Sequence, residues 1–237
     1  MTRRTPIWKA IATTVRGDIT EGVYRQGDKL PTEAVLAARF GVNRHTVRQA
    51  LAALAEEGIV HARRGAGVFV ATTPTDYPIG RRVRFHQNLT AAGRAPAKTA
   101  LLLETRPANA SEAEALQIAN GAKVHVYEGL SLAENLPIAL FRSVFPAGRF
   151  PEMLTYLRAD PSVTAALAKC GVEDYTRAST RVNAKLATAT QALHLRIAEN
   201  APILRTININ VAPDGSPIEV GRTWFAGDKV TLTLSDT

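Results

Sequence analysis

The fold of this 237-residue chain is decided by residues 30–51, which read LPTEAVLAARFGVNRHTVRQAL, and by residues 57–70, which read EGIVHARRGAGVFV. Thr32 precedes a helical run, and its hydroxyl can accept hydrogen bonds from the free N–H groups of the first turn. Gly41 is typical of a helix end, because glycine adopts positive φ without a steric penalty. Asn43 has the chemistry of a second N-cap. The pattern predicts two short helices separated by a tight turn.

The second of these helices has one apolar and one polar face. Its apolar residues recur at the i, i+3, i+4 and i+7 spacing of a buried stripe: Val47, Ala50, Leu51 and Leu54. A turn of about 100° per residue places His45, Arg48 and Gln49 on the opposite side. The N-terminal residues of a recognition helix are those that reach base edges in DNA. We therefore expect this polar face to contact DNA.

The residues after Gly58 predict a β-hairpin. Residues 60–63 alternate between apolar and polar, as a half-buried strand does. Gly65 and Gly67 supply a turn, and residues 68–70 form the returning strand. Two helices, a tight turn and a hairpin in this order predict a winged helix-turn-helix.

The same residues resemble the DNA-binding domain of the GntR family of bacterial transcription regulators. One position departs from the family pattern, because Ala34 stands where many members carry an arginine that touches DNA, so no contact is carried over to it. The resemblance and the helix geometry together imply a set of DNA-binding residues. These are Thr32, Glu33, Asn43, Arg44, His45, Thr46, Arg48, Gln49, Arg63, Arg64, Gly65 and Gly67.

Positive charge is concentrated in this part of the chain. The net charge is +8. Residues 1–72 contain eleven Lys and Arg against six Asp and Glu, and residues 81–94 add four arginines and no acidic residue. From residue 95 to the end, fourteen basic residues balance fourteen acidic ones. The excess lies where attraction to DNA phosphates requires it.

Composition also limits the cellular setting. A single cysteine, Cys170, excludes an internal disulfide and a cysteine zinc site, and it suits a reducing cytoplasm. No apolar run approaches the roughly 18 residues of a membrane span, and the N-terminus lacks the apolar core of a signal peptide. His86, His125 and His194 do not have metal-ligand spacing. We expect a cytoplasmic protein with no membrane partner, no metal and no cofactor.

A composition change marks the domain boundary. Residues 72–80 read TTPTDYPIG, and their prolines, glycine and small polar residues predict a linker. We assign residues 1–72 to the winged helix-turn-helix, 73–80 to the linker and 81–237 to a second domain. In the second domain, short β-rich runs alternate with helical stretches, which predicts a mainly antiparallel sheet and an α+β chain.

The second domain resembles the effector domain of the HutC subfamily of GntR regulators, the UTRA domain, which has a chorismate-lyase-like fold. The junction, at residues 76–78 and 84–89, is similar to that of regulators of phosphonate utilisation. Members of the subfamily hold a small, often anionic metabolite in this domain. The further residues that carry the resemblance are Gly93, residues 135–140 (NLPIAL), residues 160–162 (DPS) and residues 215–219 (GSPIE).

The resemblance implies an effector site, but this chain departs from the subfamily pattern at three positions of that site. Gly129 and Ser131 occupy the positions of a common pair of inward arginines, and Phe141 occupies that of a common glutamate. Ser162 matches a hydroxyl ligand and Glu219 a pocket carboxylate. Arginine forks suit phosphate and phosphonate oxygens, although surface ion pairs are the alternative for Arg142 and Arg222. The expected effector-binding residues are Arg84, Phe85, Arg142, Ser162, Glu219 and Arg222.

Two classes of function are open at this stage. The preferred one is a homodimeric DNA-binding repressor of an operon for phosphonate uptake or degradation, whose operator affinity depends on a small anionic effector. A regulator of amino-sugar or histidine utilisation is the alternative within this class. The competing class is a lyase-like enzyme. No nucleophile–base pair, carboxylate pair or metal cluster stands out in the sequence, and a shared fold does not establish an activity.

Overall fold

The structure is a computed structural model that describes residues 6–63, 65–71, 74–80, 89–90 and 95–234. The chain forms two compact units, Met1–Thr73 and Pro74–Thr237. Each unit has its own hydrophobic core.

The first unit has the predicted winged helix-turn-helix order. The Thr32 hydroxyl accepts a hydrogen bond from the Val35 N–H (3.4 Å), and Asn43 Oδ1 accepts one from the Thr46 N–H (2.9 Å). Gly41 ends a helix in the left-handed conformation, with φ of 63°. Both predicted caps are therefore present. The elements are α1 (Ile7–Thr20), α2 (Glu33–Phe40), α3 (Arg44–Glu56), β1 (Val60–Arg63) and β2 (Gly67–Val70).

The apolar stripe of α3 forms the centre of this unit. Val47, Ala50 and Leu54 are completely buried, against Val15 of α1 and Leu36 of α2. The hairpin pairs in antiparallel register, with the strand ends Val60 and Val70 also in the core. Because the stripe fixes the rotation of α3 about its axis, the opposite polar face has only one possible direction, toward solvent.

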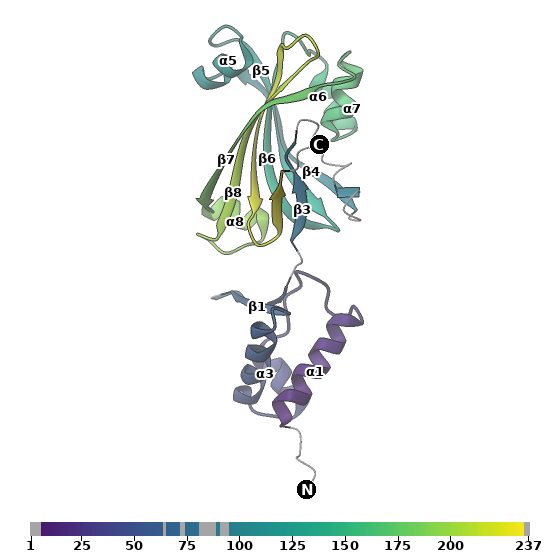
Figure 1. The fold of residues 1–237 in the computed structure, drawn as a ribbon, viewed down its shortest axis with the longest axis vertical. Helices are drawn as coiled ribbons and strands as arrows, with labels where there is room; N and C mark the ends of the chain where they lie inside the picture. The colour runs from purple at the N-terminus through teal and green to yellow at the C-terminus, as the bar shows by residue number, and fades with distance from the viewer. Residues whose placement is uncertain (1–5, 64, 72–73, 81–88, 91–94, 235–237) are drawn as a thin grey trace. The chain divides into compact units, whose positions relative to one another are not determined.

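The second unit is built on an antiparallel six-stranded sheet in the order β4-β5-β6-β9-β8-β7, as predicted in outline (Figure 1). A separate parallel pair, β3 and β10, completes its strands within the described residues. The strands are β3 (Thr75–Pro78), β4 (Pro96–Pro107), β5 (Lys123–Ala133), β6 (Leu136–Pro146), β7 (Thr176–Leu186), β8 (Pro202–Val211), β9 (Pro217–Ala226) and β10 (Val230–Thr233). The helices are α5 (Ala110–Leu116), α6 (Met153–Ala159), α7 (Val163–Lys169) and α8 (Ala189–Leu195).

The two faces of the sheet have different coverings. Tyr127, Phe141 and Phe145 pack with α6 and α7 on one face. Val126 and Leu140, whose side chains alternate with these along the same strands, face the other side. There α5 and α8 lie toward opposite ends of the strands (Figure 1).

Part of the segment expected to be a linker is a strand. The N–H of Thr75 donates to the carbonyl of Lys229 (2.8 Å), and Tyr77 packs on Phe225 with ring centroids 5.1 Å apart. Thr75 and Tyr77 are buried and alternate with exposed Asp76, which is a strand pattern. The flanking prolines obscured this short alternation, so the structure differs from the expectation at Thr75–Pro78.

The Asn43 cap gives a test of the helix-turn-helix. We expect Asn43→Ala to lower the free energy of unfolding of the DNA-binding unit by about 1 kcal/mol, because the Thr46 N–H loses its acceptor. Urea unfolding in the absence of DNA measures this change. Asn43→Asp keeps an acceptor and serves as the control. Equal stability of the Ala and Asp variants would contradict the role of the cap.

Candidate functional sites

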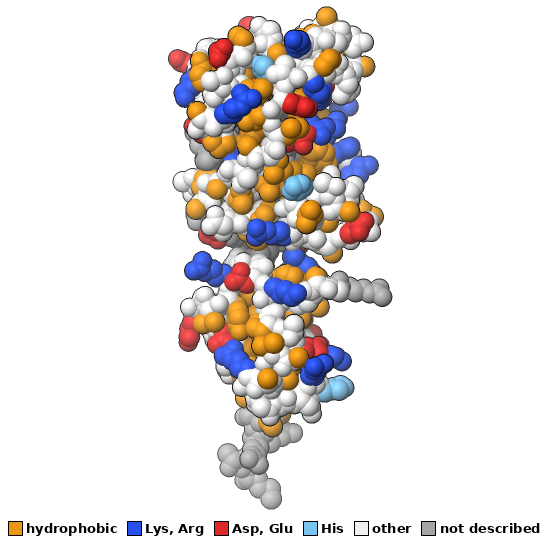
Figure 2. Space-filling view, turned by 180° about the vertical axis from the view of Figure 1, so that it is seen from behind, with side chains coloured by type: hydrophobic (Ala, Val, Ile, Leu, Met, Phe, Trp, Pro, Cys, Tyr) orange, Lys and Arg blue, Asp and Glu red, His pale blue; other side chains and the backbone are white. Residues whose placement is uncertain are grey.

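The polar face of α3 is the first candidate site. Arg44, His45, Arg48 and Gln49 are exposed. Thr46 is half-buried, and its hydroxyl donates to Asn43 Oδ1 (3.0 Å). In Figure 2 this unit shows Lys, Arg and His side chains on its surface, among exposed hydrophobic groups. The face that the periodicity predicted to point outward is therefore open to a large partner.

Two of the predicted DNA-binding residues bind each other. Arg48 Nε donates to Glu33 Oε1 (2.9 Å), and Arg48 Nη2 donates to Glu33 Oε2 (2.7 Å). The hydrogen bond from Arg48 holds the pKa of the Glu33 carboxyl below its ordinary value, with the charges of Arg48 and Arg44 adding to the effect. The pair fixes one edge of the Arg48 guanidinium against α2. Its orientation on the recognition face is thus set before any partner arrives.

The wing presents a second arginine. Arg63 Nε donates to His61 Nε2 (3.0 Å), and its guanidinium lies 4.4 Å from the centroid of the Phe69 ring. Gly65 and Gly67 have φ of 74° and 114°, so a larger residue would be strained at both positions. Arg64, also predicted to contact DNA, lies outside the described residues.

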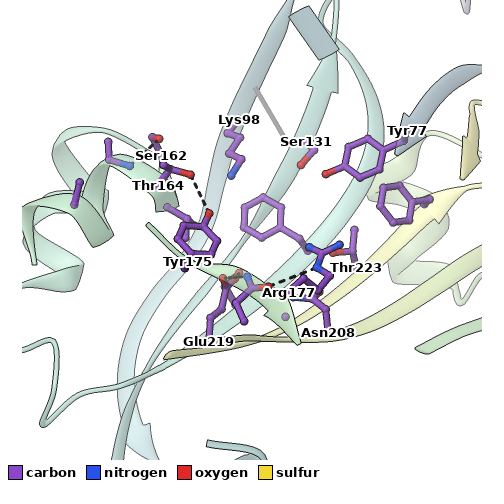
Figure 3. Close-up of a pocket in the computed structure, with 18 of the residues that line it drawn as sticks. Tyr77, Lys98, Ser131, Ser162, Thr164, Tyr175, Arg177, Asn208, Glu219 and Thr223 are labelled. Carbon is purple, nitrogen blue, oxygen red and sulfur yellow. Dashed lines mark hydrogen bonds between the residues drawn. The ribbon is translucent and has the colours of Figure 1, made fainter. Parts of the chain in front are cut away.

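The second candidate site is a cavity of about 500 Å³ in the second unit (Figure 3). It lies on the sheet face that α7 and β3 cover, and we call it the polar cavity. Strands β4 to β9, together with α7 and β3, supply its walls. The polar side chains that line it include Tyr77, Lys98, Ser131, Ser143, Ser162, Thr164, Tyr175, Arg177, Asn208, Asn210, Glu219 and Thr223.

A hydrogen-bond ladder crosses one wall of the polar cavity. Glu219 is only 6% exposed, and its Oε1 accepts from the Ser143 hydroxyl (2.6 Å). Its Oε2 accepts from Asn210 Nδ2 (2.7 Å). Asn210 Oδ1 in turn accepts from Arg177 Nε, at 3.5 Å, and from Asn208 Nδ2. The ladder holds the buried carboxylate on β9 and the arginine on β7 in fixed positions, with the two asparagines of β8 between them.

Lys98 supplies a second positive charge. Burial lowers the pKa of its ammonium to about 8, against the opposing attraction of Glu219 and Asp160. Its Nζ lies 5.0 Å from the centroid of the Phe141 ring. In the view of Figure 3, Lys98 and Glu219 lie on opposite sides of the cavity. The cavity thus combines cationic groups with a carboxylate and two amides.

Gly129 and Phe141, which both depart from the subfamily pattern, contact each other in the sheet. These residues are direct cross-strand partners. A Cβ added to Gly129 would lie 2.8 Å from Phe141 Cζ and 2.6 Å from the Thr99 carbonyl oxygen. The aromatic ring therefore occupies the space that a side chain at position 129 would need. The arginine that the subfamily pattern led us to consider at position 129 does not fit this packing.

The predicted effector residues do not all come together. Ser162 and Glu219 line the polar cavity, and Ser162 also caps α7 by accepting from the Ala165 N–H (3.3 Å). Arg142 and Arg222 do not belong to it, because they alternate along β6 and β9 with the residues that line it. Arg142 forms an ion pair with Glu128 (2.5 Å). Arg84 and Phe85 lie outside the described residues.

Several cavity residues were missed in the sequence. Lys98 and Arg177 lie on the two edge strands, and Tyr77 lies in the presumed linker. A signal was present in β8, where Asn208 and Asn210 alternate with Ile207, Ile209 and Val211. Polar residues at the inward positions of an otherwise apolar strand indicate a polar cavity, and both asparagines are buried.

A winged helix-turn-helix followed by an antiparallel-sheet domain with an internal polar cavity defines a class of protein, the two-domain transcription regulators. Residues 8–70 match the family model described as bacterial regulatory proteins, gntR family, and residues 91–231 match that of the UTRA domain. The chain belongs to the GntR family, as a HutC-type regulator with a UTRA domain.

Similar proteins support this assignment over most of the chain. The chain is 38% identical to an uncharacterized HTH-type transcriptional regulator of Rhizobium meliloti, over 96% of this chain and 94% of the relative. It is 34% identical to the probable transcriptional regulator PhnF of Escherichia coli, over 89% and 88%. The crystal structure of PhnF from Mycobacterium smegmatis aligns with a TM-score of 0.65 at 26% identity, covering 96% and 99%. These families and relatives are transcription regulators, not enzymes.

One further property concerns membranes. Among the described residues, no helix is both long and apolar enough to cross a bilayer.

The low pKa of Lys98 predicts a pH dependence of stability. Between about pH 8 and the ordinary lysine pKa of 10.5, the folded state has released a proton that the unfolded state retains. The free energy of unfolding contributed by Lys98 therefore rises with pH in this window. Urea unfolding of the parent protein and of Lys98→Met, from pH 7.5 to 10.5, isolates this contribution as a difference. A difference that stays constant or falls with pH would exclude the shift.

Proposed function

We propose that this protein is a homodimeric repressor that binds operator DNA through α3 and the wing and is controlled by a small anionic effector in the polar cavity. The observation that carries the DNA-binding part is the exposed polar face of α3, whose rotation the buried stripe fixes. Helix-turn-helix dimers read two-fold symmetric half-sites. We therefore expect an inverted repeat whose half-site centres lie about 10 bp, or a multiple of this spacing, apart.

The proposed contacts have separate roles. Arg44, His45, Arg48 and Gln49 are exposed at the N-terminal end of α3, where base edges come within reach. Thr46 supports this surface from its partly buried position. Thr32, Glu33 and Asn43 position it, through two helix caps and one ion pair. Arg63, Arg64, Gly65 and Gly67 are proposed to approach the DNA backbone from the wing.

Substitution of the arginines tests the DNA surface. We expect Arg44→Ala and Arg48→Ala each to weaken operator binding by about 1–3 kcal/mol if the arginine makes a bidentate base contact. Fluorescence anisotropy with operator DNA at fixed salt measures the change. Arg158→Ala, an exposed arginine of the second unit, is the matched control for net charge. Undiminished binding by a folded Arg44→Ala/Arg48→Ala double variant would refute the proposed surface.

Glu33→Gln distinguishes positioning from simple charge. Removing a negative charge beside DNA strengthens binding if only the local field matters. If Glu33 orients Arg48 through their two hydrogen bonds, the same change weakens binding and reduces base specificity. We expect the second result, measured as a smaller ratio of operator to non-operator affinity. A stronger, equally specific complex would show that Glu33 has no orienting role.

The effector class follows from the chemistry of the polar cavity. Lys98 and Arg177 can neutralise an anionic head group, while Glu219 and the asparagines suit a ligand that also donates hydrogen bonds. The resemblance to PhnF supports a phosphonate and, for this chain, control of a phosphonate operon. The alternative remains a regulator of amino-sugar or histidine utilisation. A sugar-derived effector has support in the mannosyl-D-glycerate transport/metabolism system repressor MngR of Escherichia coli, 28% identical over 97% of this chain. Gly129 and Ser131 stand where the subfamily commonly has a pair of arginines, and the absence of that pair favours the phosphonate.

Tyr77 is the proposed link between the effector and DNA affinity. It lines the polar cavity from β3, four residues after the boundary of the first unit at Thr73. A ligand that contacts Tyr77 can favour one placement of the segment that continues into the DNA-binding unit. Such differential binding is the requirement for allosteric control.

A ligand panel tests the effector and its coupling. We expect methylphosphonate or 2-aminoethylphosphonate to raise the thermal midpoint of the full chain. At a ligand concentration of 100 times the dissociation constant, binding to one site adds about 2.7 kcal/mol to the free energy of unfolding. Lys98→Met and Arg177→Met should reduce this shift, whereas Tyr77→Phe should bind the ligand but release operator DNA less. Stabilisation by glucosamine 6-phosphate alone would favour the alternative regulator. No shift with any member of the panel would remove the phosphonate proposal.

A further inference from the structure

The opposite face of the sheet contains a second cavity, of about 640 Å³. Three arginines line it, Arg142 from β6, Arg181 from β7 and Arg222 from β9. Its lining also includes apolar residues, Ile207 and Val220 among them, and two carboxylates, Glu112 and Glu114. We call it the arginine cavity. It shares no lining residue with the polar cavity.

The arginine cavity brings like charges together, and among the described residues Glu128 neutralises one of them through its ion pair with Arg142. Arg142 and Arg222 are direct cross-strand partners, an arrangement that is destabilising for two like charges. Burial lowers the pKa of the Arg222 guanidinium, and the neighbouring charges of Arg142 and Arg205 lower it further. Arg222 thus carries its positive charge in a place where partial removal from solvent and the charges of two neighbouring arginines both disfavour that charge.

Arg222 also has an unused donor. Within the part of the chain that the structure describes, its Nε is buried and has no hydrogen-bond partner. A buried donor of this kind costs free energy, and most such groups in proteins are satisfied. An acceptor placed in the cavity would satisfy it.

The nearby carboxylates are already engaged or face solvent. Both oxygens of Glu112 accept from Arg106, at 2.7 and 2.8 Å. Glu128 accepts from Arg142 Nε and leaves the other donors of that arginine available. Glu114, on α5, is exposed. The cavity therefore retains a surplus of guanidinium donors aimed at a space lined partly by apolar side chains.

We propose that the arginine cavity is a second anion-binding site, for a small ligand with a phosphate or phosphonate head group. Guanidinium groups from three strands can surround a tetrahedral oxyanion, and their planar donor pairs match its oxygens. Ile207 and Val220 would contact a short apolar part of the ligand. Because no lining residue is shared, the site is independent of the effector proposed for the polar cavity.

Two probes and substitutions at three positions test this site in the full-length protein. Calorimetric titration with inorganic phosphate and with methylphosphonate measures affinity and stoichiometry. We expect Arg222→Met to weaken binding at one site at least tenfold, with Lys98→Met leaving that site unchanged. Arg205→Met removes the same charge from the same sheet face but from outside the cavity lining, and it should weaken binding far less. Binding only of methylphosphonate, or only of phosphate, would identify the source of the head group.

A readout without ligand separates this role from a structural one. Removing a partly buried charge that lies beside Arg142 should raise the thermal midpoint of ligand-free Arg222→Met, although the same change abolishes stabilisation by phosphate. Ser179→Asp, which places a carboxylate at the cavity lining without altering any arginine, should also abolish phosphate binding at this site. It keeps the test decisive if Arg222→Met does not fold.

Two outcomes would overturn the proposal. The first is unchanged phosphate affinity and stoichiometry in both Arg222→Met and Ser179→Asp. The second is a change confined to the monomer–dimer equilibrium in sedimentation velocity, which would show that the arginines meet acidic groups of a second copy of the chain.

Discussion

The strict alternation of side chains along β-strands governs what the second unit can do. On β9, Glu219, Gly221 and Thr223 face the polar cavity, and Arg222 therefore faces the other side. The same rule separates Ser143 from Arg142 on β6. A single residue step thus moves a group from a carboxylate-and-amide environment to an arginine-rich one. The chemistry of both cavities is a direct consequence of strand register, which the paired hydrogen bonds of the sheet maintain.

A second constraint secures the segment that follows the DNA-binding unit. Lys229 is 2% exposed, and its Nζ donates to the carbonyl oxygens of Pro137 (3.1 Å) and Leu195 (2.6 Å). Its own carbonyl accepts from the N–H of Thr75. One residue therefore joins β3 to the start of β6 and the end of α8. Tyr77 is anchored to the sheet by this connection, so the ligand that we propose for the polar cavity would contact an ordered strand.

The helix-turn-helix could be predicted from the sequence in detail because its determinants are local. The Thr32 and Asn43 caps and the apolar stripe of α3 depend on residues within one or two turns. The polar cavity depends on which strands lie side by side, and residue spacing alone does not give this order. Lys98 and Ser131 are far apart in the chain but become cross-strand partners in the sheet. Arg142 and Arg222 were grouped with Glu219 on chemical grounds, and only the register revealed that they face away.

The contact between Gly129 and Phe141 also constrains how this protein can change over time. An arginine at position 129 would collide with the Phe141 ring and with the Thr99 carbonyl oxygen. Replacing Phe141 as well would remove only the first of these clashes, so the backbone of β4 would also have to shift. Substitutions at positions in direct contact are not additive in their effect on stability. Packing within the sheet therefore limits which side chains positions 129 and 141 can carry, and a redesign of either position has to treat the two together.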